Sequence, residues 1–252
     1  MNFQTAQQII KLNKESFNSI ASSFSDSRQN PWPEVELAIK KYIKPDDRIL
    51  DLGCGNGRLL KSLPKNIFYF GLDSSEKLIE EAQKHKSIKT KKQEGNGTMK
   101  QWGNERVKFI CGDILNLNQF KDKSFNIIFM IASFHHIPSK ELRQKVLINL
   151  HRILMSGGYL IMTNWNLWQF KNKKGVWYNL FSKKNQKGLG FKDLITLWQN
   201  KYPLYYHAFT LSELNKVLSK NNFEVLENKF ISQAKKVHFW NARNILTISR
   251  KI

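Results

Sequence analysis

A glycine-rich stretch, Arg48–Leu60, constrains the fold of this chain more than any other. An apolar run ends there on Asp51, and Gly53, Gly55 and Gly57 follow at every second position. Glycine adopts positive φ without strain and has no Cβ, so a ligand can approach the main chain closely at such a turn. The pattern predicts a strand, a ligand-binding turn and a helix that opens at once. Glycines placed for packing alone are the alternative for this motif in isolation.

Two further predicted strands also end on an acid. Residues 68–73 end on Asp73, which lies 16 residues past Gly57, close to the distance at which doubly wound folds place a ribose-binding acid. Residues 107–113 form the next strand and end on Asp113. Helix N-capping is the alternative for any one of these acids. Three consecutive strands that each end on Asp at one sheet edge favour a ligand site instead.

The hydrophobic pattern of the rest of the chain predicts one α/β domain. Further strands are expected at 126–131, 159–164, 223–231 and 244–249, and helices at 5–24, 34–43, 75–84, 139–154 and 210–219. The length fits a single domain, 1–252, with an N-terminal helical cap over 1–44 and a basic aromatic insertion over 165–207. Residues 85–105 have hardly any apolar side chain and are expected to form a solvated insertion.

Charge indicates the kind of partner. Lys and Arg number 41 against 20 acids, which gives a net charge of +21. This excess favours a polyanion as partner, with a surface charged for solubility as the alternative. Charge alone leaves RNA, DNA and an anionic membrane open.

Other features are missing from the sequence. No apolar run approaches the roughly 20 residues that a membrane span needs, and the N-terminus has no signal-peptide core. Cys54 and Cys111 lack the spacing of a disulfide framework or a zinc site. A soluble, cytoplasmic protein without a metal is therefore expected.

The insertion at 165–207 combines aromatic and basic side chains. Its aromatics are Trp165, Trp168, Phe170, Trp177, Tyr178, Phe181, Phe191 and Trp198, and its interleaved lysines are Lys171, Lys173, Lys174, Lys183, Lys184, Lys187 and Lys192. Aromatic faces stack on unpaired bases and ammonium groups meet phosphates, so this composition suits single-stranded or loop nucleic acid. An aromatic subdomain packed on the sheet, with its lysines solvated, is the alternative.

The glycine turn and its two companion acids resemble motif I and the following strands of the class I S-adenosylmethionine-dependent methyltransferases. The resemblance implies an α/β, Rossmann-like fold with a doubly wound, seven-stranded, mostly parallel sheet whose last strand is antiparallel. It also implies S-adenosylmethionine as cofactor, with Asp73 on the ribose and Asp113 beside the adenine amino group. The implied cofactor-binding residues are Asp51, Gly53, Cys54, Gly55, Asn56, Gly57, Asp73, Ser74, Asp113, Ile114, Ile131, Arg28 and Trp32.

Several stretches resemble one family within that class, the tRNA wobble-uridine carboxymethyl O-methyltransferases of the type 11 superfamily. The matching stretches are residues 20–33, which end on Pro31-Trp32-Pro33, the motif at 51–57, the pair His135-His136 and the run Leu204-Tyr205-Tyr206-His207. Leu204 departs from the family's arginine, which puts a contact to a substrate phosphate or carboxylate in doubt. Ser156 stands where proline is usual.

The resemblance implies that an ionised substrate carboxylate attacks the methyl group, so no strong general base is required. Arg28 is then expected to bind the methionine carboxylate of the cofactor or the substrate acid. His135, His136, Tyr206 and His207 are expected in the pocket that holds the base, and one histidine of the pair is expected to be structural.

The resemblance also implies partners, and two alternative functions stay open beside it. It implies tRNA or another RNA as substrate, and the eukaryotic members need a small zinc-binding activator subunit, which makes such a subunit a candidate partner. One rival is a small-molecule methyltransferase of the type 11 group, in which the basic aromatic segment forms a lid. A rival of another class is a catalytically silent RNA-binding subunit.

Overall fold

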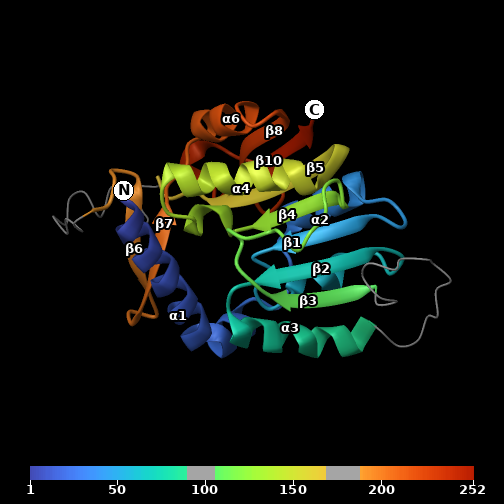
Figure 1. Ribbon diagram of the computed structural model, residues 1–252, viewed down its shortest axis with the longest axis horizontal. Coiled ribbons are helices and arrows are strands. Elements are labelled where there is room, and N and C mark those ends of the chain that lie inside the picture. Colours follow the sequence, from blue (N-terminus) through green and yellow to red (C-terminus); the bar gives the residue numbers. More distant parts are fainter. Residues whose placement is uncertain (90–105, 169–187) are drawn as a thin grey trace.

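A computed structural model describes residues 1–89, 106–168 and 188–252. Its centre is one sheet in the order β3-β2-β1-β4-β5-β10-β8-β9 (Figure 1). The strands are β1 (Arg48–Leu52), β2 (Phe68–Asp73), β3 (Val107–Cys111), β4 (Phe125–Ile131), β5 (Leu154–Trp165), β8 (Phe223–Ser232), β9 (Lys235–Lys236) and β10 (Asn244–Lys251). β1 to β5 are parallel, and β10 is antiparallel to both β5 and β8. The expected sheet is confirmed, and the two-residue β9 adds an edge.

Helices cover both faces of the sheet. α2 (Pro33–Tyr42) and α3 (Glu76–Lys89) share one apolar core with it, and α4 (Lys140–Ile153) and α6 (Leu211–Ser219) share the other. Local sequence sets where these helices begin. Pro33 opens α2, where its missing N–H costs nothing, and the Ser139 and Thr210 hydroxyls accept the backbone N–H groups of Leu142 and Glu213.

The prediction of a helix directly after the glycine turn is wrong. Residues Arg58–Ser62 form only a 3₁₀ turn, η1. Pro64 follows closely and disfavours the helical conformation of the residue before it, and β2 begins at Phe68. The connection has no room for a longer helix. The expected start of β5 also moves, because its first residue is Leu154 and a register irregularity against β4 accommodates the two glycines at 157 and 158.

The N-terminal helix α1 (Phe3–Ser27) lies across the ends of β2 and β3 toward which their arrowheads point (Figure 1). Beside it lies a separate two-stranded sheet of β6 (Asp193–Trp198) and β7 (Tyr202–His207). α1 and this sheet share a third apolar core that includes Ile20, Leu204 and Tyr206. The expected N-terminal cap therefore covers the carboxyl ends of the parallel strands.

The described part of the basic aromatic insertion forms packed structure. The rings of Trp165, Trp168 and Trp198 pack against the third core. For these three rings the structure therefore agrees with the alternative of a packed aromatic subdomain. Most of the lysines on which the nucleic-acid interpretation rests lie within 169–187, outside the described residues. The expected solvated insertion at 85–105 begins inside α3, and the rest of it is likewise outside them. Across the described ranges, no helix is both long and apolar enough to cross a membrane.

Candidate active site

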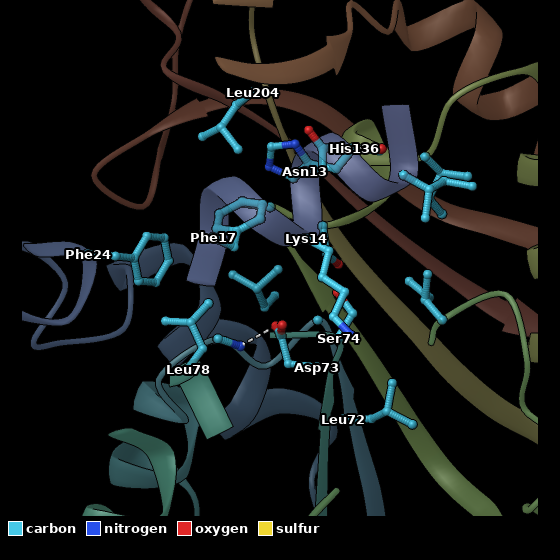
Figure 2. Close-up of a pocket in the computed structure, with 18 of the residues that line it drawn as sticks. Asn13, Lys14, Phe17, Phe24, Leu72, Asp73, Ser74, Leu78, His136 and Leu204 are labelled. Atoms are coloured by element: carbon cyan, nitrogen blue, oxygen red, sulfur yellow. Dashed lines mark hydrogen bonds between the residues drawn. The ribbon is translucent and has the colours of Figure 1, made fainter. Parts of the chain in front are cut away.

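A cavity of about 400 Å³ opens at the carboxyl ends of the parallel strands. It lies beside the β1/β4 boundary, where the strand order reverses, which is where open α/β sheets bind ligands. Figure 2 shows Asp73 and Ser74 at one end and His136 and Leu204 at the other, with side chains of α1 between them. The two ends are called here the sheet end and the aromatic end.

The glycine turn forms the wall of the sheet end. Gly53 has φ of 76° and Gly57 of 72°, a region that favours glycine. Gly53 and Gly55 line the cavity. Gly57 does not line it, and a Cβ there would lie 2.8 Å from the Phe109 ring in the core. Gly57 therefore serves close packing, and the other two glycines keep the wall free of side chains.

Replacing Gly53 with alanine is expected to lower the free energy of unfolding by about 2–5 kcal/mol, because a left-handed residue and an overpacked contact each cost part of that amount. The new Cβ would lie 2.5 Å from the Cβ of Ser133. Gly157→Ala is the matched control, since Gly157 also has φ of 72° but no heavy atom within 4 Å of the place that an added methyl group would take. Urea unfolding of both variants measures the difference, and equal losses would contradict a steric clash at Gly53.

Asp73 is held at the end of β2 by main-chain donors. Its Oδ2 accepts the N–H of Gly55 at 2.9 Å, and its Oδ1 accepts the N–H of Ser75 at 2.9 Å. Burial raises the pKa of this carboxyl, and the N–H donors act against that shift. Each oxygen keeps a further lone pair, so the carboxylate can accept a ligand's hydroxyl groups. Ser74, Asp113 and Ile114 line the same end of the cavity.

A smaller recess adjoins the cavity at the end of β1 and is lined by Asp51, Cys54, Asn56 and Arg58. Tyr69 donates its hydroxyl to Asp51 Oδ2 at 2.8 Å. Burial raises the pKa of Asp51 to about 7, against the opposing effects of this hydrogen bond and of the Arg58 charge. The recess therefore pairs an acid of unusual pKa with a guanidinium.

Asn56 and Arg58 connect this recess to the N-terminal cap. Asn56 Nδ2 donates to the Arg28 carbonyl at 3.1 Å. Its buried Oδ1 has no hydrogen-bond partner among the described groups, so it can accept from a ligand. The Arg58 guanidinium lies 4.8 Å from the centre of the Trp32 ring. Trp32 and Ile131 line both the recess and the main cavity.

The aromatic end carries a neutral histidine. His136 Nδ1 lies 2.8 Å from the Tyr205 carbonyl oxygen. Because that oxygen only accepts, Nδ1 carries the proton and Nε2 is an acceptor. Burial lowers the pKa of His136 to about 4. Tyr206 lies 4.6 Å from the His136 ring and stacks on Trp165 at 5.1 Å, measured between ring centres.

Arg28 supplies the positive charge at the aromatic end. Its guanidinium carbon lies 4.6 Å from the centre of the Phe24 ring and 4.4 Å from that of Trp198. Burial lowers its pKa. None of the ion pairs among the described residues involves this arginine. It is partly buried, and it donates to the Ser27 hydroxyl at 2.8 Å. A cation placed against two rings and lining a cavity is arranged to meet an anionic group.

The other predicted catalytic residues lie outside the cavity lining. His135 is fully buried behind His136, where its Nδ1 accepts the Trp165 N–H at 3.3 Å. His207 lies between two carboxylates, with Nδ1 2.7 Å from Asp193 and Nε2 2.8 Å from Glu213. These contacts make His135 a support for the cavity wall and His207 a link between β7 and α6.

The sequence prediction missed Asn13. Its Nδ2 donates to the His136 carbonyl at 3.2 Å, and its Oδ1 accepts the Tyr205 N–H at 2.9 Å. It is 7% exposed and lines the cavity. Its position in the apolar stripe of α1, between Ile9 and Phe17, was the available signal. Arg58 was also missed, because no local pattern distinguishes it. Trp198 was named only as an insertion aromatic suited to nucleic acid, and the structure adds that it lines this cavity.

The chain is similar to a known protein family and to relatives from several organisms. The methyltransferase domain family matches residues 50–162. A tRNA (carboxymethyluridine(34)-5-O)-methyltransferase of Schizosaccharomyces pombe is 25% identical over 228 residues, covering 85% of this chain and 89% of that protein. The Saccharomyces cerevisiae protein of the same name is 32% identical over 160 residues, covering 63% of this chain and 50% of that protein. The match thus spans only half the length of the S. cerevisiae relative.

Two solved structures share the fold. A SAM-dependent methyltransferase from Methanosarcina mazei has a TM-score of 0.64 and 21% identity, with 88% of this chain and 99% of that chain covered. A Haloferax volcanii methyltransferase, solved in complex with the Trm112 methyltransferase activator, has a TM-score of 0.62 and 17% identity, with 94% and 96% covered. At these identities the likeness shows the fold alone.

This chain is a class I S-adenosylmethionine-dependent methyltransferase. The class is defined by the doubly wound sheet, by the glycine turn with acids at the ends of neighbouring strands, and by the family match. Within that class, the chain resembles the tRNA wobble-uridine carboxymethyl O-methyltransferases. S-adenosylmethionine is its cofactor, and the sheet end of the cavity fits that molecule. Gly53 and Gly55 leave the wall open, and Asp73 offers acceptors for hydroxyl groups.

Proposed function

We propose that this enzyme methylates the carboxymethyl group of a modified wobble uridine in tRNA. The observation that carries the proposal is Arg28, a partly buried guanidinium without a described carboxylate partner, which lies against Phe24 and Trp198 at the aromatic end of the cavity. A flat base that carries an acid matches both features: its ring can stack on aromatic side chains and its carboxylate can pair with the guanidinium. The names of the relatives support the same substrate.

The two arginines then have separate roles. Arg58 lies near the Asp51 carboxylate, and we assign this pair to the amino-acid part of the cofactor. Arg28 contacts Trp198 of the β6–β7 sheet and faces the same end as Tyr206, so we assign it to the substrate carboxylate. Asp73 is assigned to the ribose hydroxyls, and Asp113 with Ile114 to the adenine.

The cofactor supplies an electrophilic methyl group on a sulfonium centre. The substrate carboxylate is already ionised at neutral pH, since such acids have a pKa of about 4, so the protein needs no base to activate it. His136 is neutral at that pH and can accept a hydrogen bond without changing the charge of the pocket. Alignment by Arg28 and exclusion of water by α1 and the β6–β7 sheet are the contributions of the protein, worth up to roughly 7–11 kcal/mol in favourable intramolecular reactions.

An activator of the Trm112 type is a proposed partner, because a methyltransferase of the same fold was solved in complex with one. With a tRNA substrate we also propose a cytoplasmic location. The activator enters the test of function as a separate condition, so that a missing subunit and a wrong substrate give different results.

The test is methyl transfer from labelled S-adenosylmethionine to tRNA that lacks wobble carboxymethyl esters, with and without a Trm112-type activator, followed by nucleoside analysis. Label in a carboxymethyluridine ester in either condition is the expected result. Label at another nucleoside would overturn the carboxymethyl specificity. In a parallel assay with small carboxylic acids as methyl acceptors, label there but never in tRNA would favour the small-molecule rival.

A further inference from the structure

The connection between β8 and β10, residues 233–243, is anchored next to residues that line the cavity. It contains β9 and the short 3₁₀ turn η3 (Phe239–Asn241). Asn166, which directly follows the cavity-lining Trp165, donates its Nδ2 to the carbonyls of Phe239 at 2.8 Å and Ala242 at 3.1 Å. These bonds fix the connection to the carboxyl end of β5, the strand that leads into the aromatic end of the cavity.

A second anchor joins the end of the connection to the N-terminal cap. Asn244 Nδ2 donates to Glu34 Oε1 at 2.8 Å, and both side chains are buried. Glu34 lies two residues after Trp32, which lines the cavity. The two anchors thus fix the connection next to residues that line the cavity, Trp165 at one anchor and Trp32 at the other.

The surface of this connection is cationic. No Asp or Glu occurs from residue 228 to the last residue, 252. Lys235, Lys236 and Arg243 are exposed, and none of them forms an ion pair with another described residue. Their charges are not neutralised within the described chain, so they are available to phosphate groups.

An exposed aromatic ring stands among these charges. Trp240 is 50% exposed, and its ring centre lies 4.6 Å from that of Phe239. Phe239 in turn contacts Phe230 of β8 at 5.1 Å. The indole is therefore supported from the sheet, and the residue remains half exposed. A supported, exposed ring beside lysines is the arrangement on which single-stranded bases stack.

We propose that residues 233–243 form an RNA-docking surface, in which Trp240 stacks on an unpaired base near the one that enters the cavity, while Lys235, Lys236 and Arg243 contact phosphates. This inference rests on the proposed tRNA substrate. A base that enters a cavity must be unpaired, and its neighbours in a loop offer free faces for stacking. The cationic character of the surface disfavours a protein partner, because the cores of protein interfaces are depleted in charge.

The first test compares two triple variants that lose the same charge. Lys235→Ala/Lys236→Ala/Arg243→Ala removes the proposed phosphate contacts, and Lys145→Ala/Lys216→Ala/Lys220→Ala removes three exposed lysines from α4 and the end of α6. The measurement is the dissociation constant of an anticodon stem-loop RNA across salt concentrations. The logarithm of the association constant falls linearly with the logarithm of the salt concentration. The magnitude of that slope is expected to decrease by about 2–3 in the first variant and to stay near the wild-type value in the second. Equal changes in both would overturn the proposal.

The second test concerns stacking. Trp240→Ala is expected to weaken RNA binding by about fivefold or more, whereas Trp240→Phe, which keeps a stacking face, is expected to retain most of the affinity. Wild-type affinity in Trp240→Ala would overturn the role of the ring.

Cofactor binding, measured by calorimetry, is expected to be unchanged in every variant and serves as the control for folding. Wild-type protein that neither binds nor methylates tRNA would overturn both the proposed function and the docking surface. Wild-type protein that methylates tRNA, with a Lys235/Lys236/Arg243 triple variant that binds RNA equally well, would overturn the docking surface alone.

Discussion

Replacing Arg28 with glutamine is expected to lower kcat/KM for methyl transfer to tRNA by at least about 30-fold, since truncating one partner of a buried charge pair commonly costs 2–5 kcal/mol. Glutamine keeps a polar group of similar length but loses the charge. The nearby Arg58, whose charge interacts with that of Arg28, lies over the Trp32 ring and is assigned to the cofactor, so it is not expected to replace Arg28. The loss is expected in transfer to the substrate, with a much smaller change in cofactor affinity.

Arg28→Lys is the matched control, because it keeps the charge and removes the planar group that stacks on the two rings. It is expected to recover part of the activity but not all of it, since the two cations are not equivalent at a stacked site. Cofactor affinity decides between the two roles that the sequence leaves open for this residue. A loss of cofactor affinity as large as the loss of activity would assign Arg28 to the methionine carboxylate and contradict the separate role given to Arg58.

The parallel half of the sheet could be predicted from the sequence because its signals are local. Each strand is an apolar run that ends on an acid or a turn, and Pro33, Ser139 and Thr210 mark helix starts. The length of η1 could not be predicted with the same rule, because the helix pattern after the glycine turn is cut short by Pro64 and by the nearby start of β2.

The cofactor end of the site was predictable for the same reason, since its residues follow one another at the ends of neighbouring strands. The aromatic end was not, because it is assembled from α1, η2 (Phe134–His136) and the β6–β7 sheet, which are far apart in the chain. The histidines illustrate the difference. The sequence places His135, His136 and His207 in one predicted pocket, but of these three only His136 lines the cavity. His135 and His136 are adjacent in a turn and point in different directions, and hydrogen bonds to Asp193 and Glu213 hold His207 outside the cavity lining.

Replacing Asp73 with alanine is expected to weaken S-adenosylmethionine binding by about 10- to 150-fold, the equivalent of roughly 1.5–3 kcal/mol for hydrogen bonds to a charged group. The carboxylate would lose its contacts to the ribose hydroxyls, and the Gly55 N–H would lose the acceptor that fixes the glycine turn. Calorimetric titration with the cofactor measures the loss. Affinity unchanged from the wild type would place the ribose elsewhere in the cavity.

The fold of the Asp73→Ala variant is expected to survive. Burial raises the pKa of Asp73, so the ionised carboxylate opposes folding at neutral pH, where the unfolded chain holds it in water. Removing it relieves that cost and partly offsets the two lost main-chain hydrogen bonds. Asp73→Asn, which keeps one acceptor oxygen, is the graded control and is expected to bind the cofactor with intermediate affinity. RNA binding and its salt dependence are expected to be unchanged in both variants, because Asp73 lines the cavity and residues 233–243 do not. A parallel loss of RNA affinity would show that the substitution disturbs the whole domain and not the cofactor site.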